Sequence, residues 1–153
     1  KWPNDVVAMT NAKLRKVGGI LSECSFQNDR IEYAVVGIGL NVNVDFSHQE
    51  SLRNIATSLM ELNGGSINRL VVLKSIVRRF IDHYSWLGNE VKLRDAWRAR
   101  LINLGQRVRV QSGADILEGL AEAVDIDGAL LLRTADGQVR RLLSGDVTLH
   151  GFG

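Results

Sequence analysis

The sequence has one cysteine, one proline and no apolar run that approaches the length of a membrane span. A single cysteine cannot form an internal disulfide, and without a Cys-x-x-Cys pair or closely spaced histidines we expect no zinc site. Cys24 lies in an apolar stretch, so we expect a buried structural thiol rather than a nucleophile. No secretory signal opens the chain, and these absences together predict a cytoplasmic protein without membrane contact.

The sequence also lacks a large excess of positive or negative charge. The 153 residues contain 19 Lys and Arg and 17 Asp and Glu, which gives a formal net charge of +2. Basic residues are scattered among acidic ones, a pattern typical of a solvated surface, and this does not support binding to nucleic acid. With 45% hydrophobic and 24% charged residues, the chain has the composition of a folded, soluble protein.

The first third of the chain, residues 2–44, is rich in strand-forming residues. Asp5–Met9 and Ile31–Gly39 are the clearest strand segments, and Gln27–Asp29 is a suitable hairpin turn between strands of about ten residues. We therefore expect a mixed β-sheet in this region, with helices on one face.

The middle of the chain has the periodicity of helices. Apolar side chains recur at helical spacing over three segments, residues 52–62, 70–84 and 91–101. Asn63-Gly64-Gly65 is a stop signal for the first of them. We expect the apolar stripes of these helices to be core faces and not ligand-binding sites.

From about Leu104 the pattern changes to short β segments. Asp127-Gly128 and Asp136-Gly137 stand between apolar runs, which is a strong hairpin signal. About five short strands in about 45 residues predict a small SH3-like barrel, which protects its edges by closing on itself. The sequence thus predicts an α+β fold in two domains, residues 1–103 and 104–153.

Three segments carry residues suited to chemistry. K-W-P-N-D at residues 1–5 places an aromatic ring, an amide and a carboxylate at a strand entry. K-V-G-G at residues 16–19 places an ammonium beside two glycines, where an anion can approach the backbone. G-I-G-L-N at residues 37–41 gives a ligand room at a strand end and offers an amide to an adenine edge. Taken singly, the first two segments are better explained as a buried aromatic with a turn and as a basic turn.

Their order is more specific than any one of them. K-W-P-N-D, then K-V-G-G-I-L, then G-I-G-L-N-V-N, with the tail L-S-G-D-V-T-L at residues 143–149, resembles the bacterial biotin–protein ligases. The resemblance covers essentially the whole chain. It implies the later part of a class II synthetase-like catalytic domain, followed by the SH3-like C-terminal domain of that family.

The resemblance also implies an activity. Members of the family join biotin to ATP, which yields biotinyl-5′-AMP and pyrophosphate, and then transfer biotin to a lysine. The expected acceptor is the biotin carboxyl carrier protein domain of a carboxylase. ATP, biotin and Mg²⁺ are the expected cofactors, with Mg²⁺ bound mainly through phosphate oxygens and water. The resemblance leaves open a homodimer and an N-terminal DNA-binding domain.

Residue by residue, Lys16 matches the lysine that contacts the biotin carboxylate and the α-phosphate. Asp5 matches a carboxylate that we expect to orient the incoming lysine and to help remove its proton. The other residues implied in binding biotin or the adenylate are Trp2 along the ligand, Asn4 near the phosphates, Asn41 at the adenine, and Gly18, Gly19, Gly37 and Gly39, which leave room for it.

The sequence departs from the family at its start. Lys1 is not a methionine and falls inside a motif, so we expect a chain truncated or processed at its N-terminus. The family's biotin loop, G-R-G-R-x-G-R, precedes K-W-P-N-D and is absent here, so we expect this chain alone not to complete the reaction. A non-catalytic nucleotide- or carrier-binding remnant is the alternative. These residues do not support a transcriptional regulator, and lipoate ligases lack this combination of motifs.

Overall fold

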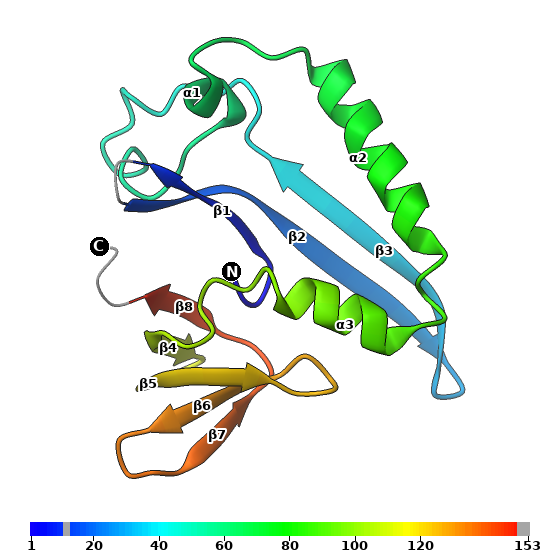
Figure 1. Cartoon of the computed structure of the whole chain (residues 1–153), viewed down its shortest axis with the longest axis vertical. Helices are drawn as coiled ribbons and strands as arrows, with labels where there is room; N and C mark the ends of the chain where they lie inside the picture. The colour runs from blue at the N-terminus through cyan, green and yellow to red at the C-terminus, as the bar shows by residue number, and fades with distance from the viewer. Residues whose placement is uncertain (11–12, 150–153) are drawn as a thin grey trace. The chain divides into compact units, whose positions relative to one another are not determined.

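The structure is a computed structural model that describes residues 1–10 and 13–149. The chain divides into two compact units. We call Asn4–Arg69 the N-terminal unit, and Lys1–Pro3 together with Leu70–Gly153 the C-terminal unit. One sheet of three strands and one of five strands, with helices in the same chain, confirm the expected α+β class (Figure 1).

The sheet of the N-terminal unit has the order β1-β2-β3, formed by β1 (Asp5–Thr10), β2 (Lys13–Gln27) and β3 (Arg30–Leu40). Asn28 and Asp29 have φ of 50° and 58°, so the expected turn is confirmed as a two-residue hairpin loop. Such short connections allow only antiparallel neighbours, because a parallel pair needs a long crossover. The expected mixed sheet is therefore wrong for these three strands, which all pair antiparallel. One isolated parallel bridge joins Lys16 to Ala56.

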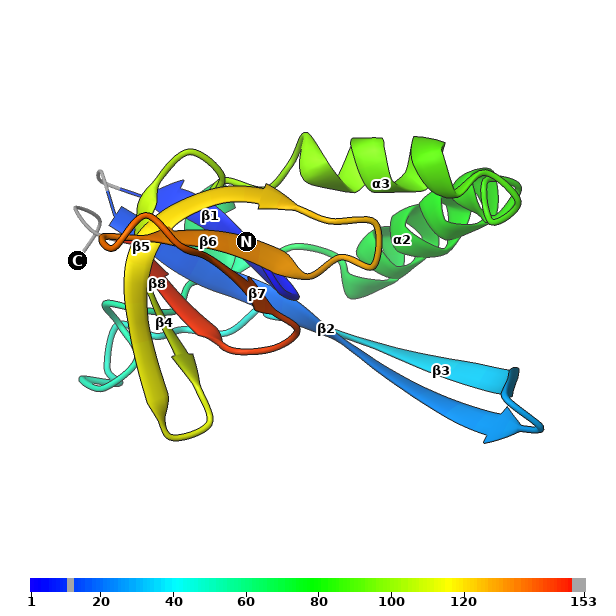
Figure 2. The same ribbon diagram turned by 90° about the horizontal axis from the view of Figure 1, so that it is seen from below.

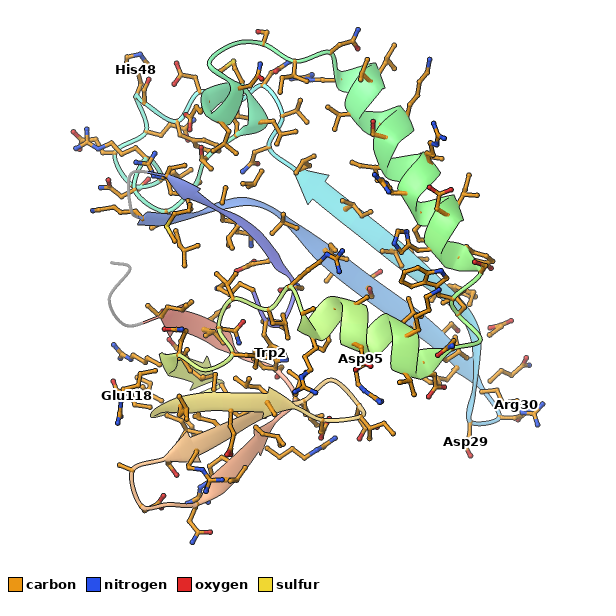
Figure 3. The ribbon with its side chains drawn as sticks, viewed as in Figure 1. Trp2, Asp29, Arg30, His48, Asp95 and Glu118 are labelled. Atoms are coloured by element: carbon orange, nitrogen blue, oxygen red, sulfur yellow. The ribbon has the colours of Figure 1, made fainter. Side chains whose placement is uncertain are left out.

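Strands β2 and β3 continue together beyond the end of β1 as a long two-stranded ribbon (Figure 2). Asp29 and Arg30 lie at its tip (Figure 3). Cys24 lies on this ribbon and is exposed, so the expectation of a buried thiol is wrong. An apolar neighbourhood in sequence does not bury a strand residue unless a second layer covers that face of the strand.

The first helix is much shorter than the apolar spacing of residues 52–62 suggests. Helix α1 covers Leu59–Asn63, Ser58 is its N-cap, and Gly64 ends it with φ of 73°, which confirms the expected stop. The chain before Ser58 cannot continue the helix, because Ile55 and Thr57 bond through their backbones to Lys16. The apolar spacing therefore predicted the helix correctly over residues 59–62 and wrongly over residues 52–58.

Helices α2 (Arg69–Tyr84) and α3 (Glu90–Arg98) lie close to the expected ranges. Neither helix has a buried residue, and the apolar stripe of α2 is exposed, with Leu73 at 55% and Phe80 at 53%. The expectation of a core face is wrong for α2, because amphipathic spacing selects a face but does not supply the surface that covers it. None of the helices in the described residues combines the length and apolarity that a membrane span needs.

The C-terminal unit contains a five-stranded antiparallel sheet in the order β7-β6-β5-β4-β8. Its strands are β4 (Arg107–Ser112), β5 (Asp115–Val124), β6 (Leu130–Thr134), β7 (Val139–Leu142) and β8 (Asp146–Leu149). Gly128 and Gly137 both have φ of 82°, which agrees with the two expected Asp-Gly hairpin turns. Within residues 104–149, β7 and β8 are the two edges and do not pair, so no closed barrel is formed by these strands.

Apolar side chains on one side of this sheet form the core of the unit. Val108, Val110, Leu130 and Leu132 are completely buried. They alternate along their strands with more exposed residues, as expected for a sheet with one covered face.

Trp2 is part of the same core, although it lies more than 100 positions away in sequence (Figure 3). It is 1% exposed. Its backbone N–H donates to Asn103 Oδ1 at 2.9 Å, and its indole Nε1–H donates to the Gly128 carbonyl at 2.9 Å. Lys1 Nζ donates to the carbonyl of Val147 at 2.8 Å. The first residues of the chain are therefore anchored on the five-stranded sheet.

The turn that receives Trp2 is held by charged side chains. Asp125 Oδ1 accepts the backbone N–H groups of Asp127 and Ala129, while Arg141 donates to the carboxylates of both Asp125 and Asp127. The hydrogen bond from Arg141 lowers the pKa of Asp125 below its ordinary value. A carboxyl whose pKa is lowered by folding stabilises the fold above its unfolded pKa, and that stabilisation is lost as the pH falls through its folded pKa.

The substitution Trp2→Phe tests this anchor. We expect it to lower the free energy of unfolding by about 1 kcal/mol, because the ring is kept while the Gly128 carbonyl loses its donor. Urea unfolding measures the change. Trp86→Phe is the control, since the Trp86 ring contacts Lys92 and, among the described residues, its indole N–H has no hydrogen-bond acceptor. Equal losses in the two variants would contradict a specific role for the Trp2 hydrogen bond.

Candidate functional site

A groove of about 850 Å³ opens in the N-terminal unit, which is a suitable size for a small-molecule ligand. It is lined by the first half of β2, the last residues of β3 and the segment between β3 and α1. All of its lining residues belong to this unit: Asn4, Lys16, Gly18, Gly19, Ile20, Leu21, Gly37, Ile38, Gly39, Leu40, Asn41, Phe46, Leu52 and Ala56.

Lys16 and Asp5, the two expected catalytic residues, form an ion pair at this groove. Lys16 Nζ lies 2.6 Å from Asp5 Oδ1, and the exposed fractions of the two side chains are 52% and 16%. The register of β1 and β2 brings them together, since Asp5 is opposite Gly19 and a bulge follows at Val6 and Val7. A Cβ on Gly19 would lie 3.4 Å from Lys16 Cε, so this glycine leaves room for the lysine side chain to reach Asp5.

The exposure of Lys16 decides what this ion pair can do. A pair with one half-exposed member stabilises the fold by about 0–1 kcal/mol. An incoming anion can therefore replace Asp5 as the partner of the Lys16 ammonium at small cost. The Lys16 ammonium thus lies at the groove, with its counter-ion Asp5 beside it and one side accessible to a ligand.

Asn4 joins the two strands next to this pair. Its Nδ2 donates to the carbonyl of Ile20 at 2.8 Å, and its own carbonyl accepts the Ile20 N–H at 2.9 Å. Among the described residues, none donates a hydrogen bond to the side-chain oxygen of Asn4. Asn4 thus fixes the start of β1 beside the groove, which it also lines.

The four expected glycines have different surroundings. A Cβ on Gly18 would lie 2.3 Å from the Gly39 carbonyl oxygen, so the strand pairing itself requires glycine at position 18. At Gly37 and Gly39 the nearest atom to an added Cβ is 3.8 Å away, which is normal van der Waals contact. Glycine at these two positions widens the groove and is not needed for strand packing.

Asn41 is already engaged with the protein. Its Nδ2 donates to the Thr57 carbonyl at 3.1 Å and lies 3.5 Å from the Lys16 carbonyl, while its backbone N–H donates to Val17. A two-bond contact with an adenine edge uses both the donor and the acceptor of an asparagine amide. Because Nδ2 is engaged, Oδ1 is the atom of the Asn41 amide that can bind a ligand in the groove.

Two expected site residues, Asp5 and Trp2, do not line the groove themselves. Asp5 lies next to it through its ion pair with Lys16, whereas Trp2 has no such link. It belongs to the C-terminal unit and its ring is buried there. Its surroundings match the alternative that the sequence left open, a buried aromatic at a strand entry.

Sequence reasoning missed two polar residues behind the groove, Thr57 and Glu61. Thr57 Oγ1 donates to Glu61 Oε2 at 2.8 Å, and Thr57 is 1% exposed. The signal that points to Glu61 is the pattern S-L-M-E at residues 58–61, which has the form of a helix capping box. That pattern locates the helix start but does not show where the carboxylate is directed.

Comparison with known proteins identifies the family. Residues 104–149 match the family described as biotin protein ligase C terminal domain. The bifunctional ligase/repressor BirA of Bacillus spizizenii is 33% identical over 97% of this chain and 45% of its own length. The biotin–[acetyl-CoA-carboxylase] ligase of Mycobacterium tuberculosis is 32% identical over 96% of this chain and 51% of its own length.

Comparison with solved structures indicates the same family. A biotin protein ligase from Aquifex aeolicus, in complex with biotin and ATP, superposes with a TM-score of 0.72 and 28% identity, over 97% of this chain and 60% of that one. The chain spans about half the length of the two curated relatives. The similarity extends over nearly all of the chain and includes both units. The chain belongs to the biotin protein ligase family.

Proposed function

We propose that the protein containing this chain is a biotin–protein ligase. In the first step a biotin carboxylate oxygen attacks the α-phosphorus of ATP, the bond to the leaving group breaks, and biotinyl-5′-AMP and pyrophosphate form. In the second step a lysine amine of a carrier protein attacks the biotin acyl carbon, AMP leaves, and the amine loses a proton. The names and ligands of the relatives support this proposal.

The observation that carries the proposal is the Lys16–Asp5 pair at the groove. Two anions, a carboxylate and a phosphate, must approach each other in the first step. A fixed ammonium at Lys16 offsets their repulsion and the charge that builds on the phosphate oxygens during attack. Asp5 can then accept a hydrogen bond from the incoming lysine amine and help remove its proton.

Nucleotide binding in the same groove is part of the proposal. Gly37 and Gly39 leave room beside β3 for the nucleotide, and Asn41 Oδ1 can accept from the adenine amino group. The described residues contain no cluster of three or more His, Cys, Asp or Glu side chains that could hold a metal. Mg²⁺ would therefore enter with ATP, held by phosphate oxygens and water, and no residue is assigned as its ligand.

The arrangement of domains is also proposed. We assign residues 1–103 to the catalytic domain and 104–153 to the C-terminal domain of the family, and the family match over residues 104–149 supports the second assignment. The acceptor would be the biotin carboxyl carrier protein domain of a carboxylase, in line with the name of the relative from Mycobacterium tuberculosis.

Biotin-dependent exchange of pyrophosphate with ATP is the direct test. The assay uses the protein as encoded, with whatever residues precede Lys1, beside the 153-residue chain. Exchange that requires biotin supports the ligase. Binding of nucleotide or carrier without any exchange in the encoded protein would reject it in favour of a non-catalytic binding protein.

The role of Asp5 makes a separate prediction. We expect Asp5→Asn to slow biotin transfer to the carrier about tenfold more than it slows adenylation, since general-base catalysis contributes to the second step. Single-turnover transfer from preformed biotinyl-5′-AMP, compared with pyrophosphate exchange, separates the two steps. Equal slowing of both steps in Asp5→Asn would count against the assignment.

A further inference from the structure

Glu61 departs from the usual geometry of a helix capping box. In that motif the N-cap side chain bonds to the backbone N–H at the third helical position, and the acidic side chain there bonds back to the N-cap backbone. Ser58 makes its half of the motif, accepting from the Glu61 N–H at 3.2 Å. The Glu61 carboxylate instead accepts from Thr57 Oγ1 and from the backbone N–H of Phe46, both at 2.8 Å.

These two bonds connect two segments that line the groove. Phe46 and Ala56 both line it, and Thr57 directly follows Ala56. Thr57 is 1% and Phe46 7% exposed, and both hydrogen bonds to Glu61 are partly buried. A carboxylate that accepts two hydrogen bonds from partly buried donors holds them strongly, because charged hydrogen bonds are stronger than neutral ones.

The segment that contains Thr57 also holds the backbone of Lys16. The Lys16 N–H donates to Ile55 at 2.8 Å, and the Lys16 carbonyl accepts from the Thr57 N–H at 2.9 Å. Asn41 completes the connection, since its Nδ2 donates to the Thr57 carbonyl. Thr57 is thus bonded through its hydroxyl to Glu61, through its N–H to Lys16 and through its carbonyl to Asn41.

We propose that Glu61 is a positioning residue for adenylation, which fixes Lys16 through Thr57 while it also holds the groove-lining segment at Phe46. The inference rests on the proposed function, because that function gives the position of Lys16 its importance. Glu61 itself contacts neither biotin nor ATP in the proposed reaction, because its carboxylate is bonded to Thr57 and Phe46. A displacement of about 1 Å at a reacting group can cost about a hundredfold in rate, so a residue behind the site can have a large effect.

Four variants separate positioning from helix capping. Glu61→Ala removes both bonds, and Thr57→Val removes one of them with little change of shape. Glu61→Gln is the conservative variant, since its oxygen can accept from Phe46 and its amide can donate to Thr57 Oγ1. Ser58→Ala is the matched control, because it weakens the same helix end and leaves the contacts of Glu61 with Thr57 and Phe46 in place.

Steady-state pyrophosphate exchange is measured on the protein as encoded. We expect Glu61→Ala to lower kcat about ten- to hundredfold with little change in KM for ATP or biotin. Thr57→Val should lower kcat by a smaller factor, Glu61→Gln should recover most of the activity, and Ser58→Ala should stay close to wild type. Thr57→Val should add little to Glu61→Ala in the double variant, because Glu61→Ala already removes the hydrogen bond that Thr57→Val removes.

Amide hydrogen exchange gives a readout that does not depend on activity. We expect the N–H groups of Lys16 and Thr57 to exchange about tenfold faster in Glu61→Ala, and at the wild-type rate in Ser58→Ala. Unchanged exchange at Lys16 in Glu61→Ala, or an equal fall of kcat in Glu61→Ala and Ser58→Ala, would overturn the proposal. A wild-type protein without pyrophosphate exchange would instead reject the proposed function, while the amide measurement would still decide whether Glu61 holds Lys16.

Discussion

Lys16→Ala is expected to lower biotin-dependent pyrophosphate exchange by about 10²–10³-fold, the usual effect of removing one fixed group that stabilises transition-state charge. Lys16 lies at the groove with its ammonium 2.6 Å from Asp5. In the proposed reaction this is the cation that meets both the biotin carboxylate and the α-phosphate. Its loss leaves two anions to approach each other without compensation.

The fold should tolerate this change. The Lys16 side chain is half exposed, and its pair with Asp5 stabilises the fold by about 1 kcal/mol at most. The backbone bonds of Lys16 to Ile55 and Thr57 do not depend on the side chain. A large loss of rate with an almost unchanged free energy of unfolding is therefore the expected combination.

Two further variants sharpen the test. Lys13→Ala removes a lysine from the same strand that does not line the groove, and should leave exchange unchanged. Lys16→Arg keeps the charge but replaces a compact ammonium by a planar fork, and should recover only part of the rate. If Lys16→Ala and Lys13→Ala had the same activity, Lys16 would have no role in adenylation.

Local signals in the sequence were sufficient for the strands and turns. A two-residue turn at Asn28 and Asp29, and glycine turns at Gly128 and Gly137, depend on backbone conformations that few residues adopt easily. The choice of residue therefore reveals the turn directly. The hairpins follow from the turns, because a short connection determines which strands are neighbours.

Burial could not be predicted in the same way. The spacing of the α2 stripe gives its apolar face, and the residues around Cys24 are apolar, but both are exposed. Burial depends on a second surface that comes from elsewhere in the chain, and periodicity carries no information about it. Trp2 is the opposite case, because its cover comes from Asn103 and Gly128, far away in sequence.

The site shows the same division. The ordered motifs indicated Lys16, Asp5 and Asn41 because these residues lie in segments that resemble the family's own. The full set of Glu61 contacts could not be inferred, since its bond from the Phe46 N–H joins residues 15 positions apart through an irregular segment. The bridge that places Ala56 beside Lys16 is also non-local, and the backbone bonds beside it end the expected helix early.

Gly18→Ala should lower the free energy of unfolding by about 1–3 kcal/mol or more, as expected when a well-packed interior must accept an extra methyl group. The new Cβ would lie 2.3 Å from the Gly39 carbonyl oxygen and 3.2 Å from Leu40 Cα. Both are backbone atoms of the paired strand, so no side-chain rotation relieves the contact. The pairing of β2 with β3 must shift beside Lys16, and activity should fall together with stability.

Gly39→Ala is the matched control, because Gly39 pairs with Gly19 in the same ladder and also lines the groove. Its new Cβ would come no closer than 3.8 Å to any atom, so stability should stay within about 0.5 kcal/mol of wild type. Under the proposed function the methyl group takes space from the nucleotide, and KM for ATP should rise. Urea unfolding and pyrophosphate exchange on both variants thus distinguish the glycine that the sheet requires from the glycine that the ligand requires. Equal stability of the two variants would show that β2 can move away from Gly39 at no cost, and Gly18 would then have to be explained by the ligand as well.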